Sequence, residues 1–132
     1  MNISDNQYCF ICGHRNPVGL KATMKVDREG KSAACTLVIP SEYQGWKDMV
    51  HGGIISALLD EVCVYAGMTV SASVVTGELK TRFRKPVPVE QEVTVSARVT
   101  NQVRRTVQVE GQLTMEGIVL ASAEAKLVIV QS

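Results

Sequence analysis

The sequence predicts an α+β domain in which a curved antiparallel sheet wraps around one long central helix. Two strand-like segments come first, one helix that is apolar on nearly all sides follows, and four alternating segments complete the chain. A single helix cannot cover both faces of a six-stranded sheet, so we expect the sheet to curl around it. The other face must then be solvated or packed against a second copy, and strands rich in Val and Leu favour a homo-oligomer.

The first 50 residues contain two predicted strands. Residues 1–20 are rich in turn-forming dipeptides and are predicted to be irregular. From Leu20 to Val26 apolar and polar residues alternate, which predicts the first strand, and Arg28–Lys31 reads as a hairpin turn. Ala33–Pro40 is the second strand, ended by its proline, and a loop with the only tryptophan follows.

The predicted helix covers residues 51–68, and its length is too short for a membrane span. Predicted strands then cover residues 70–84, 91–101, 103–116 and 118–130. Turns are expected at Lys85–Pro88, at Asn101-Gln102 and at Glu116-Gly117. Gly111, inside its strand, suggests a bulge or a bend.

Length and charge narrow the class of protein. With 132 residues the chain has the size of a single domain, residues 1–132. The 14 basic and 13 acidic residues argue against nucleic acid or a membrane surface as a partner. The sequence shows no apolar run as long as a bilayer span and no secretory leader, and its four cysteines fit reduced thiols, so we expect a cytoplasmic protein.

A glycine-rich motif leads directly into the helix. In His51-Gly52-Gly53 the two glycines allow a ligand to approach the backbone closely, and the first N–H groups of a helix favour negative charge. Together they indicate an oxyanion hole that polarises an acyl carbonyl. The alternative is that the glycines only form a tight loop before the helix.

Two carboxylates lie in the middle of this apolar helix. Burying a carboxylate without a partner is costly, and acids in such places are often functional. Asp60 shares one helical stripe with Gly53 and Ser56, whereas Glu61 is rotated by about 100°. We therefore assign function to Asp60 and expect Glu61 to reach towards solvent.

The motifs together resemble a known family. They are Cys9-x-x-Cys12-Gly13 with Asn16-Pro17-x-Gly19-Leu20, Val50-His51-Gly52-Gly53 with Asp60-Glu61, and Phe83-Arg84-Lys85-Pro86-Val87-Pro88. The chain resembles the hotdog-fold acyl-CoA thioesterases of the phenylacetic-acid-degradation type. The resemblance implies dimers whose sheets join edge to edge, with active sites between the subunits.

The resemblance also assigns roles to single residues. Asp60 matches the acidic residue that acts as general base or nucleophile in the family. Gly52 matches the glycine whose backbone N–H binds the thioester oxygen, and Thr76 matches the hydroxyl residue that helps to orient water. His51 opens the same motif. Some relatives carry Asn where this chain has Gly45, and the adjacent Gln44 is a candidate substitute. Candidate substrate-binding residues are Gln44, Gly53, Glu61, Arg84, Lys85, Arg104 and Arg105.

Among these residues Arg84, Lys85, Arg104 and Arg105, together with Arg82, form the densest basic grouping in the sequence. They either mark a solvated sheet edge that discourages strand pairing or bind the phosphates of coenzyme A.

The expected activity is hydrolysis of an acyl-CoA thioester to free CoA and a carboxylic acid, with no cofactor. A dehydratase or hydratase on the same fold and a non-catalytic acyl-CoA-binding module are the alternatives. The acyl group, the choice between dimer and tetramer, and the role of Asp60 as nucleophile or base stay open.

The motif Cys9-x-x-Cys12-x-His14 is a candidate metal site. Structural zinc needs four ligands, and the remaining candidates, Cys35, Cys63 and His51, lie in different elements. We therefore favour a turn that closes the N-terminal segment over the barrel mouth over a metal site, and the question whether Cys9, Cys12 and His14 bind a metal stays open.

Overall fold

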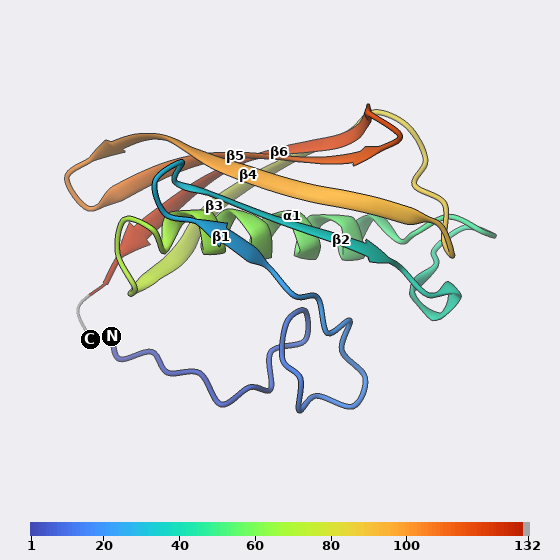
Figure 1. The fold of residues 1–132 in the computed structure, drawn as a ribbon, viewed down its shortest axis with the longest axis horizontal. Helices are drawn as coiled ribbons and strands as arrows, with labels where there is room; N and C mark the ends of the chain where they lie inside the picture. The colour runs from blue at the N-terminus through green and yellow to red at the C-terminus, as the bar shows by residue number, and fades with distance from the viewer. Residues whose placement is uncertain (131–132) are drawn as a thin grey trace.

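The computed structural model describes residues 1–130, and residues 131–132 of the predicted domain lie outside the described residues. One long helix packs against a six-stranded antiparallel sheet, which confirms the predicted fold (Figure 1). The elements are β1 (Lys25–Asp27), β2 (Ser32–Val38), the 3-10 helix η1 (Ser41–Tyr43), α1 (Gly52–Gly67), β3 (Val74–Phe83), β4 (Glu92–Val103), β5 (Thr106–Met115) and β6 (Ile118–Ile129).

The strand order in the sheet is β1-β2-β4-β5-β6-β3, so β3 crosses over to pair with the last strand. Every neighbouring pair is antiparallel. The two edges of the sheet are therefore β1 and β3. The helix α1 lies on the inner face of the sheet, and the N-terminal segment passes along the other side of the helix (Figure 1).

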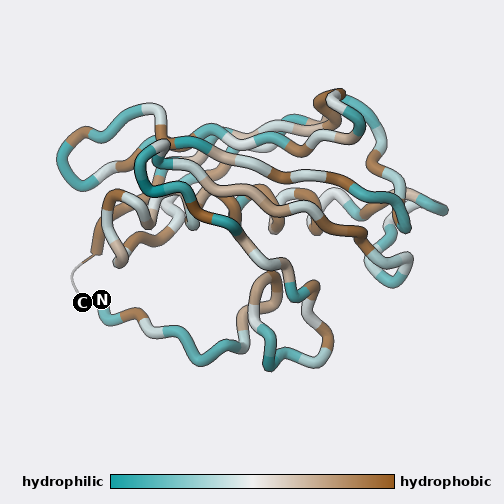
Figure 2. Tube along the Cα trace, in the orientation of Figure 1, coloured by the Kyte–Doolittle hydropathy of each residue, from teal (hydrophilic) through white to brown (hydrophobic). Residues whose placement is uncertain are grey.

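Apolar and polar residues alternate along the strands (Figure 2). Because successive side chains of a strand point to opposite faces, the sheet has an apolar inner face and a polar outer face. The inward positions of β4, β5 and β6 are buried, namely Val93, Val95, Ala97, Val107, Val109, Leu113, Ala121, Ala123, Ala125 and Leu127. Ser, Thr, Gln and charged residues occupy the positions between them. These buried residues face α1. Other large apolar side chains on the strands stay exposed, namely Val26, Val38, Phe83, Val103, Ile118 and Val128. The helix therefore does not cover every apolar strand position, and the homo-oligomer stays a prediction.

The first strand is shorter than predicted. The alternating residues Leu20–Met24 lie outside the sheet, because the Leu20 N–H donates to the Phe10 carbonyl at 3.0 Å and the Ala22 N–H to the Ile11 carbonyl at 2.8 Å. Between them Lys21 has a φ of 52°. The alternation reflects packing against the N-terminal segment rather than pairing within the sheet.

The β4–β5 hairpin turns at Arg104-Arg105, and not at Asn101-Gln102 as predicted, with Arg104 at a φ of 57°. The predicted turn at Glu116-Gly117 is confirmed.

Gly111 does not form a bulge, because its pairing with Ala97 and Ala123 is continuous. A Cβ at this position would lie 3.0 Å from the Cys63 Sγ, so the glycine allows close contact between sheet and helix. No helix within residues 1–130 is both long and apolar enough to cross a bilayer.

Candidate active site

One stripe of α1 faces the edge strand β3. The Ser56 hydroxyl donates to the Thr81 Oγ1 at 3.3 Å. One helical turn earlier, a Cβ on Gly52 would lie 3.5 Å from the Phe83 ring. One turn later, Asp60 completes the stripe. The spacing of four residues therefore brings the proposed oxyanion donor and the proposed base onto the same side of the helix.

Asp60 is held by a strand residue. The Thr76 hydroxyl donates to Asp60 Oδ1 at 2.6 Å, and the Asp60 side chain is half-buried. A register shift between Thr76 and Glu78 follows directly, so Gly77 is a β-bulge of the kind that re-aims side chains near functional sites. Asp60 Oδ2 accepts no hydrogen bond from residues 1–130, which leaves it free to bind water.

His51 caps the helix. Its Nδ1 accepts a hydrogen bond from the Gly53 N–H at 2.8 Å, and its backbone is extended. The Gly53 N–H is therefore occupied. The Gly52 N–H, in the first turn, has no intrahelical acceptor and finds none elsewhere among the described residues. At the positive end of the helix dipole Gly52 thus offers a free donor to an oxyanion.

We expect His51 to act through this cap rather than through proton transfer. Asn is a favoured N-cap residue, so His51→Asn should keep both the melting temperature and most of kcat. His51→Ala should lower the free energy of unfolding by about 1 kcal/mol. Thermal melts and steady-state assays check both variants. A folded but inactive His51→Asn protein would show that the imidazole itself takes part in the chemistry.

A cavity opens beside the free donor. It has a volume of about 380 Å³ and is lined by Gly45, Trp46, Met49, Val50, His51 and Gly52. Trp46 is 84% exposed at this position, an unusual place for a large apolar ring. The cavity therefore combines an apolar wall with one polar donor, as small-molecule sites commonly do.

Gln44, the candidate substitute for the Asn of some relatives, holds the loop that borders this cavity. Its side-chain carbonyl accepts the Asp48 N–H at 2.9 Å. At the adjacent Gly45 a Cβ would lie 3.3 Å from the His51 Cα, so the loop packs closely against the start of the helix. Gln44 is placed to shape the loop.

Glu61 does not join Asp60. Its Oε2 accepts a hydrogen bond from the Cys9 Sγ at 3.4 Å, on the side of α1 covered by the N-terminal segment. Burial raises the pKa of the nearby Cys12 thiol to about 12, and the Glu61 carboxylate adds to the rise. Glu61 is half-buried, because the N-terminal segment packs beside it and covers part of the side chain.

The predicted grouping of Arg84 and Lys85 with Arg104 and Arg105 is wrong, because the structure places the two pairs at different ends of the sheet. Arg84 and Lys85 follow the end of β3, and both backbone N–H groups donate to the Leu120 carbonyl. Arg104 and Arg105 form the β4–β5 turn at the opposite end of the sheet. β3 has 10 residues, so roughly 30 Å separates the two pairs at about 3.3 Å per residue.

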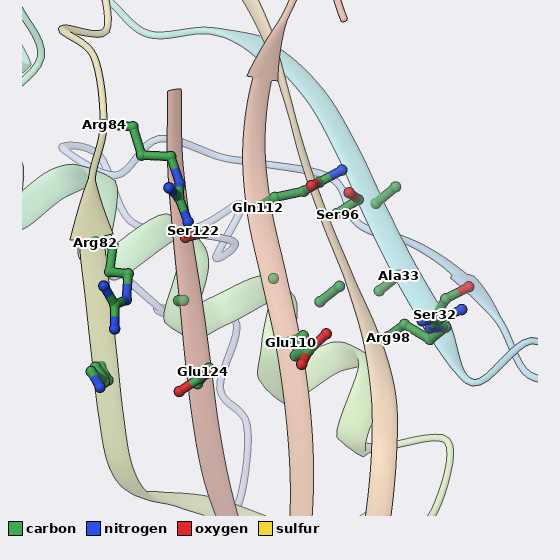
Figure 3. A pocket seen from close by; sticks show the side chains of 15 residues that line it. Ser32, Ala33, Arg82, Arg84, Ser96, Arg98, Glu110, Gln112, Ser122 and Glu124 are labelled. Atoms are coloured by element: carbon green, nitrogen blue, oxygen red, sulfur yellow. Dashed lines mark hydrogen bonds between the residues drawn. The ribbon is translucent and has the colours of Figure 1, made fainter. Parts of the chain in front are cut away.

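The outer face of the sheet carries a separate groove of about 560 Å³. Arg82 of β3 and Arg84, just after the end of β3, lie along this groove with Ser122 of β6, and Arg84 Nη2 donates to the Ser122 Oγ at 3.5 Å (Figure 3). The sheet separates the groove from Asp60. These cations therefore lie away from the stripe of α1 that carries Asp60.

Sequence reasoning missed Thr81, which faces the same stripe of α1 as Thr76. Residues 76 and 81 differ by an odd number, so simple alternation places their side chains on opposite faces of the sheet. The bulge at Gly77 adds one residue and restores both to the inner face. The signal in the sequence that could have revealed this bulge is Gly77, because a glycine inside a strand often marks a bulge.

Comparison with known proteins defines the class. A family model described as the thioesterase superfamily matches residues 48–122, more than half of the chain, and the protein therefore belongs to that superfamily. No protein of curated function matches.

Solved structures agree in fold. A thioesterase superfamily protein superposes with a TM-score of 0.86 at 25% identity over 94% of this chain, which spans only 61% of that protein. A phenylacetic acid degradation-related protein from Ralstonia eutropha has a TM-score of 0.76 at 25% identity, with 83% of this chain and 86% of its own covered. Escherichia coli PaaI, from the phenylacetic acid degradation operon, has a TM-score of 0.78 at 18% identity, with 86% and 82% covered.

Proposed function

We propose that this protein hydrolyses an acyl-CoA thioester to free CoA and a carboxylic acid. The observation that supports this most directly is that Asp60, fixed by Thr76, and the free Gly52 N–H both lie on the side of α1 that faces the edge strand β3, where a second copy can pair. A carboxylate that accepts a proton and a donor that binds an oxyanion are the two groups that thioester hydrolysis requires. Membership of the thioesterase superfamily supports the reaction class.

The working site is shared between two subunits. Gly52 and Asp60 are eight residues apart, about 12 Å along one helix at 1.5 Å per residue. One thioester carbonyl cannot contact both groups of the same chain at about 3 Å. We therefore pair Gly52 of one subunit with Asp60 of the other, in a homodimer or a tetramer built from dimers.

The edge strand β3 is suited to this pairing. It carries Thr76 near Asp60 and Phe83 near Gly52, and no described strand pairs with its outer edge. Antiparallel pairing of β3 with its copy places the Gly52 end of one helix level with the Asp60 end of the other. The two-fold axis then generates two equivalent sites.

The chemistry follows from these positions. The thioester oxygen accepts the Gly52 N–H, which stabilises negative charge as the carbonyl carbon is attacked. Asp60 Oδ2 takes a proton from water, while Thr76 holds Oδ1 and so orients the carboxylate. The tetrahedral intermediate then collapses and the carbon–sulfur bond breaks. The CoA sulfur leaves with the proton that Asp60 took from water. Direct attack by Asp60 would instead form an anhydride, which water then hydrolyses.

A panel of acyl-CoA esters with a thiol-trapping dye tests the proposal. We expect thiol release with saturated and aromatic acyl groups, and the panel identifies the preferred one. Hydration of a crotonyl-type thioester without thiol release would contradict the proposal and favour a hydratase. A single turnover in ¹⁸O-water separates the two roles of Asp60, since only the general base delivers label to the first acid product.

We place the nucleotide phosphates of CoA near Arg84, since it lies on the strand end closest to Gly52. Arg84→Ala should raise KM for CoA esters by about tenfold and leave kcat nearly unchanged. KM for thioesters that lack the nucleotide should not change. Arg28→Ala, in the exposed β1–β2 turn, is the matched control. Equal losses with both kinds of substrate would indicate a structural role for Arg84.

A further inference from the structure

Three metal-ligating side chains meet on the side of α1 that faces away from the sheet. Cys9 and Cys12 come from the N-terminal segment and Glu61 from the helix, and their ligand atoms all lie within 4.8 Å of one another. All three side chains are half-buried. The reaction proposed above uses none of them.

Hydrogen bonds to the Cys9 sulfur stabilise the turn that contains the two cysteines. The Cys9 Sγ accepts the backbone N–H groups of Ile11 at 3.3 Å and Cys12 at 3.4 Å. Backbone donors of this kind stabilise a thiolate. Gly13 closes the turn with a hydrogen bond from its N–H to the Cys9 carbonyl at 2.9 Å, and a Cβ there would lie 2.3 Å from the Cys9 nitrogen. The Cys-x-x-Cys-Gly pattern is therefore needed to present both sulfurs on one side.

We propose that Cys9, Cys12 and Glu61 bind a zinc ion, with water as the fourth ligand. Zinc–sulfur and zinc–oxygen bonds of about 2.3 and 2.1 Å place tetrahedral ligand atoms roughly 3.6 to 3.8 Å apart. The distance of 3.4 Å between the Cys9 Sγ and the Glu61 Oε2 already fits. The two distances from Cys12 to these residues are at most 4.8 Å, so the ligand atoms need to move by about 1 Å to bind the ion. On binding, each thiol releases its proton to solvent as the zinc–sulfur bond forms, and no oxidant is involved.

The surroundings leave room for the ion and its water. A surface cavity of about 280 Å³ reaches Cys12 and Tyr65, and Asp5 and His14 also line it. The Tyr65 hydroxyl donates to the Cys12 Sγ at 3.3 Å, a contact that orients a ligand sulfur. An ion at this position would join the N-terminal segment to the helix beside the catalytic stripe.

The test begins with the full-length protein purified without chelators. We expect one zinc per chain by elemental analysis, and a thiolate-to-cobalt charge-transfer band after exchange with Co²⁺. Cys9→Ser, Cys12→Ser and Glu61→Gln should each weaken zinc binding at least about tenfold in a competition titration with a chromophoric chelator. Cys35→Ala, in β2 and away from the cluster, is the matched control and should keep full binding.

Alkylation with mass mapping keeps the test decisive if a cysteine variant fails to fold. In the zinc-loaded protein Cys9 and Cys12 should be protected, and a chelator should expose both while Cys35 and Cys63 stay buried. Metal well below one per chain after zinc addition would overturn the proposal. So would zinc binding that survives loss of both cysteines, or a Cys9–Cys12 disulfide that forms in place of metal uptake.

Discussion

Asp60→Asn is expected to lower kcat by about two orders of magnitude or more, the usual contribution of a positioned general base. The amide has nearly the same size and still accepts the Thr76 hydrogen bond, but it no longer takes up a proton or attacks a carbonyl. A neutral amide is no harder to bury than a carboxylate, so the fold should persist. Steady-state kinetics with a circular dichroism melt measure both quantities.

Three further variants test the geometry around Asp60. Thr76→Val removes the hydroxyl that orients the carboxylate and should reduce kcat, whereas Thr76→Ser should restore it. Glu61→Gln is the comparison within the helix, because its carboxylate contacts Cys9 on another side. If Glu61→Gln abolished turnover while Asp60→Asn kept the wild-type kcat, the assignment of the base would be wrong.

Gly52→Pro is expected to lower kcat by about 10²- to 10³-fold, the cost of losing one oxyanion donor. Proline removes only the N–H at this position, and it is well tolerated at the first residue of a helix. The extended backbone of His51 suits a residue before proline, and ordinary van der Waals distance separates a Cβ here from Phe83. Gly52→Ala retains the N–H and is the matched control, expected to stay active.

Mixed oligomers distinguish a shared site from one within a single chain. An Asp60→Asn chain still contributes Gly52, and a Gly52→Pro chain still contributes Asp60. If the site is shared, re-associating equal amounts of the two inactive proteins should restore about a quarter of the wild-type activity, because half of the dimers are mixed and each has one intact site. No recovery despite subunit exchange would place both groups of each site in one chain.

The parts of the fold that could be predicted are those set by local pattern. The apolar circumference of residues 52–67 marks a buried helix, and strict alternation marks the long strands. Glu116-Gly117 was recognised because both positions need a positive φ, which a glycine makes evident. Helical phase correctly predicts that Asp60 and Glu61 lie on different sides of α1, where they contact Thr76 and Cys9, and the catalytic role of Asp60 stays a prediction.

What could not be predicted depends on contacts between distant segments. Cys9 and Glu61 are 52 residues apart, and only the docked N-terminal segment brings them together. Gly111 was interpreted as a bulge because nothing local reveals that Cys63 packs against it. The cap formed by His51 was missed as well, since histidine is not among the favoured N-cap residues.

The crossover of β3 delays the completion of the sheet during synthesis. Thr76 is held in the sheet by pairing with Leu127, a partner that leaves the ribosome about 50 residues later. Until β6 has been synthesised, nothing fixes Thr76 beside Asp60, and the inner face of β3 stays exposed. Such non-local pairing is intrinsically slow to form and leaves the unfinished chain prone to aggregation. The site of the proposed reaction is therefore complete only after β6 has been synthesised and has paired with β3.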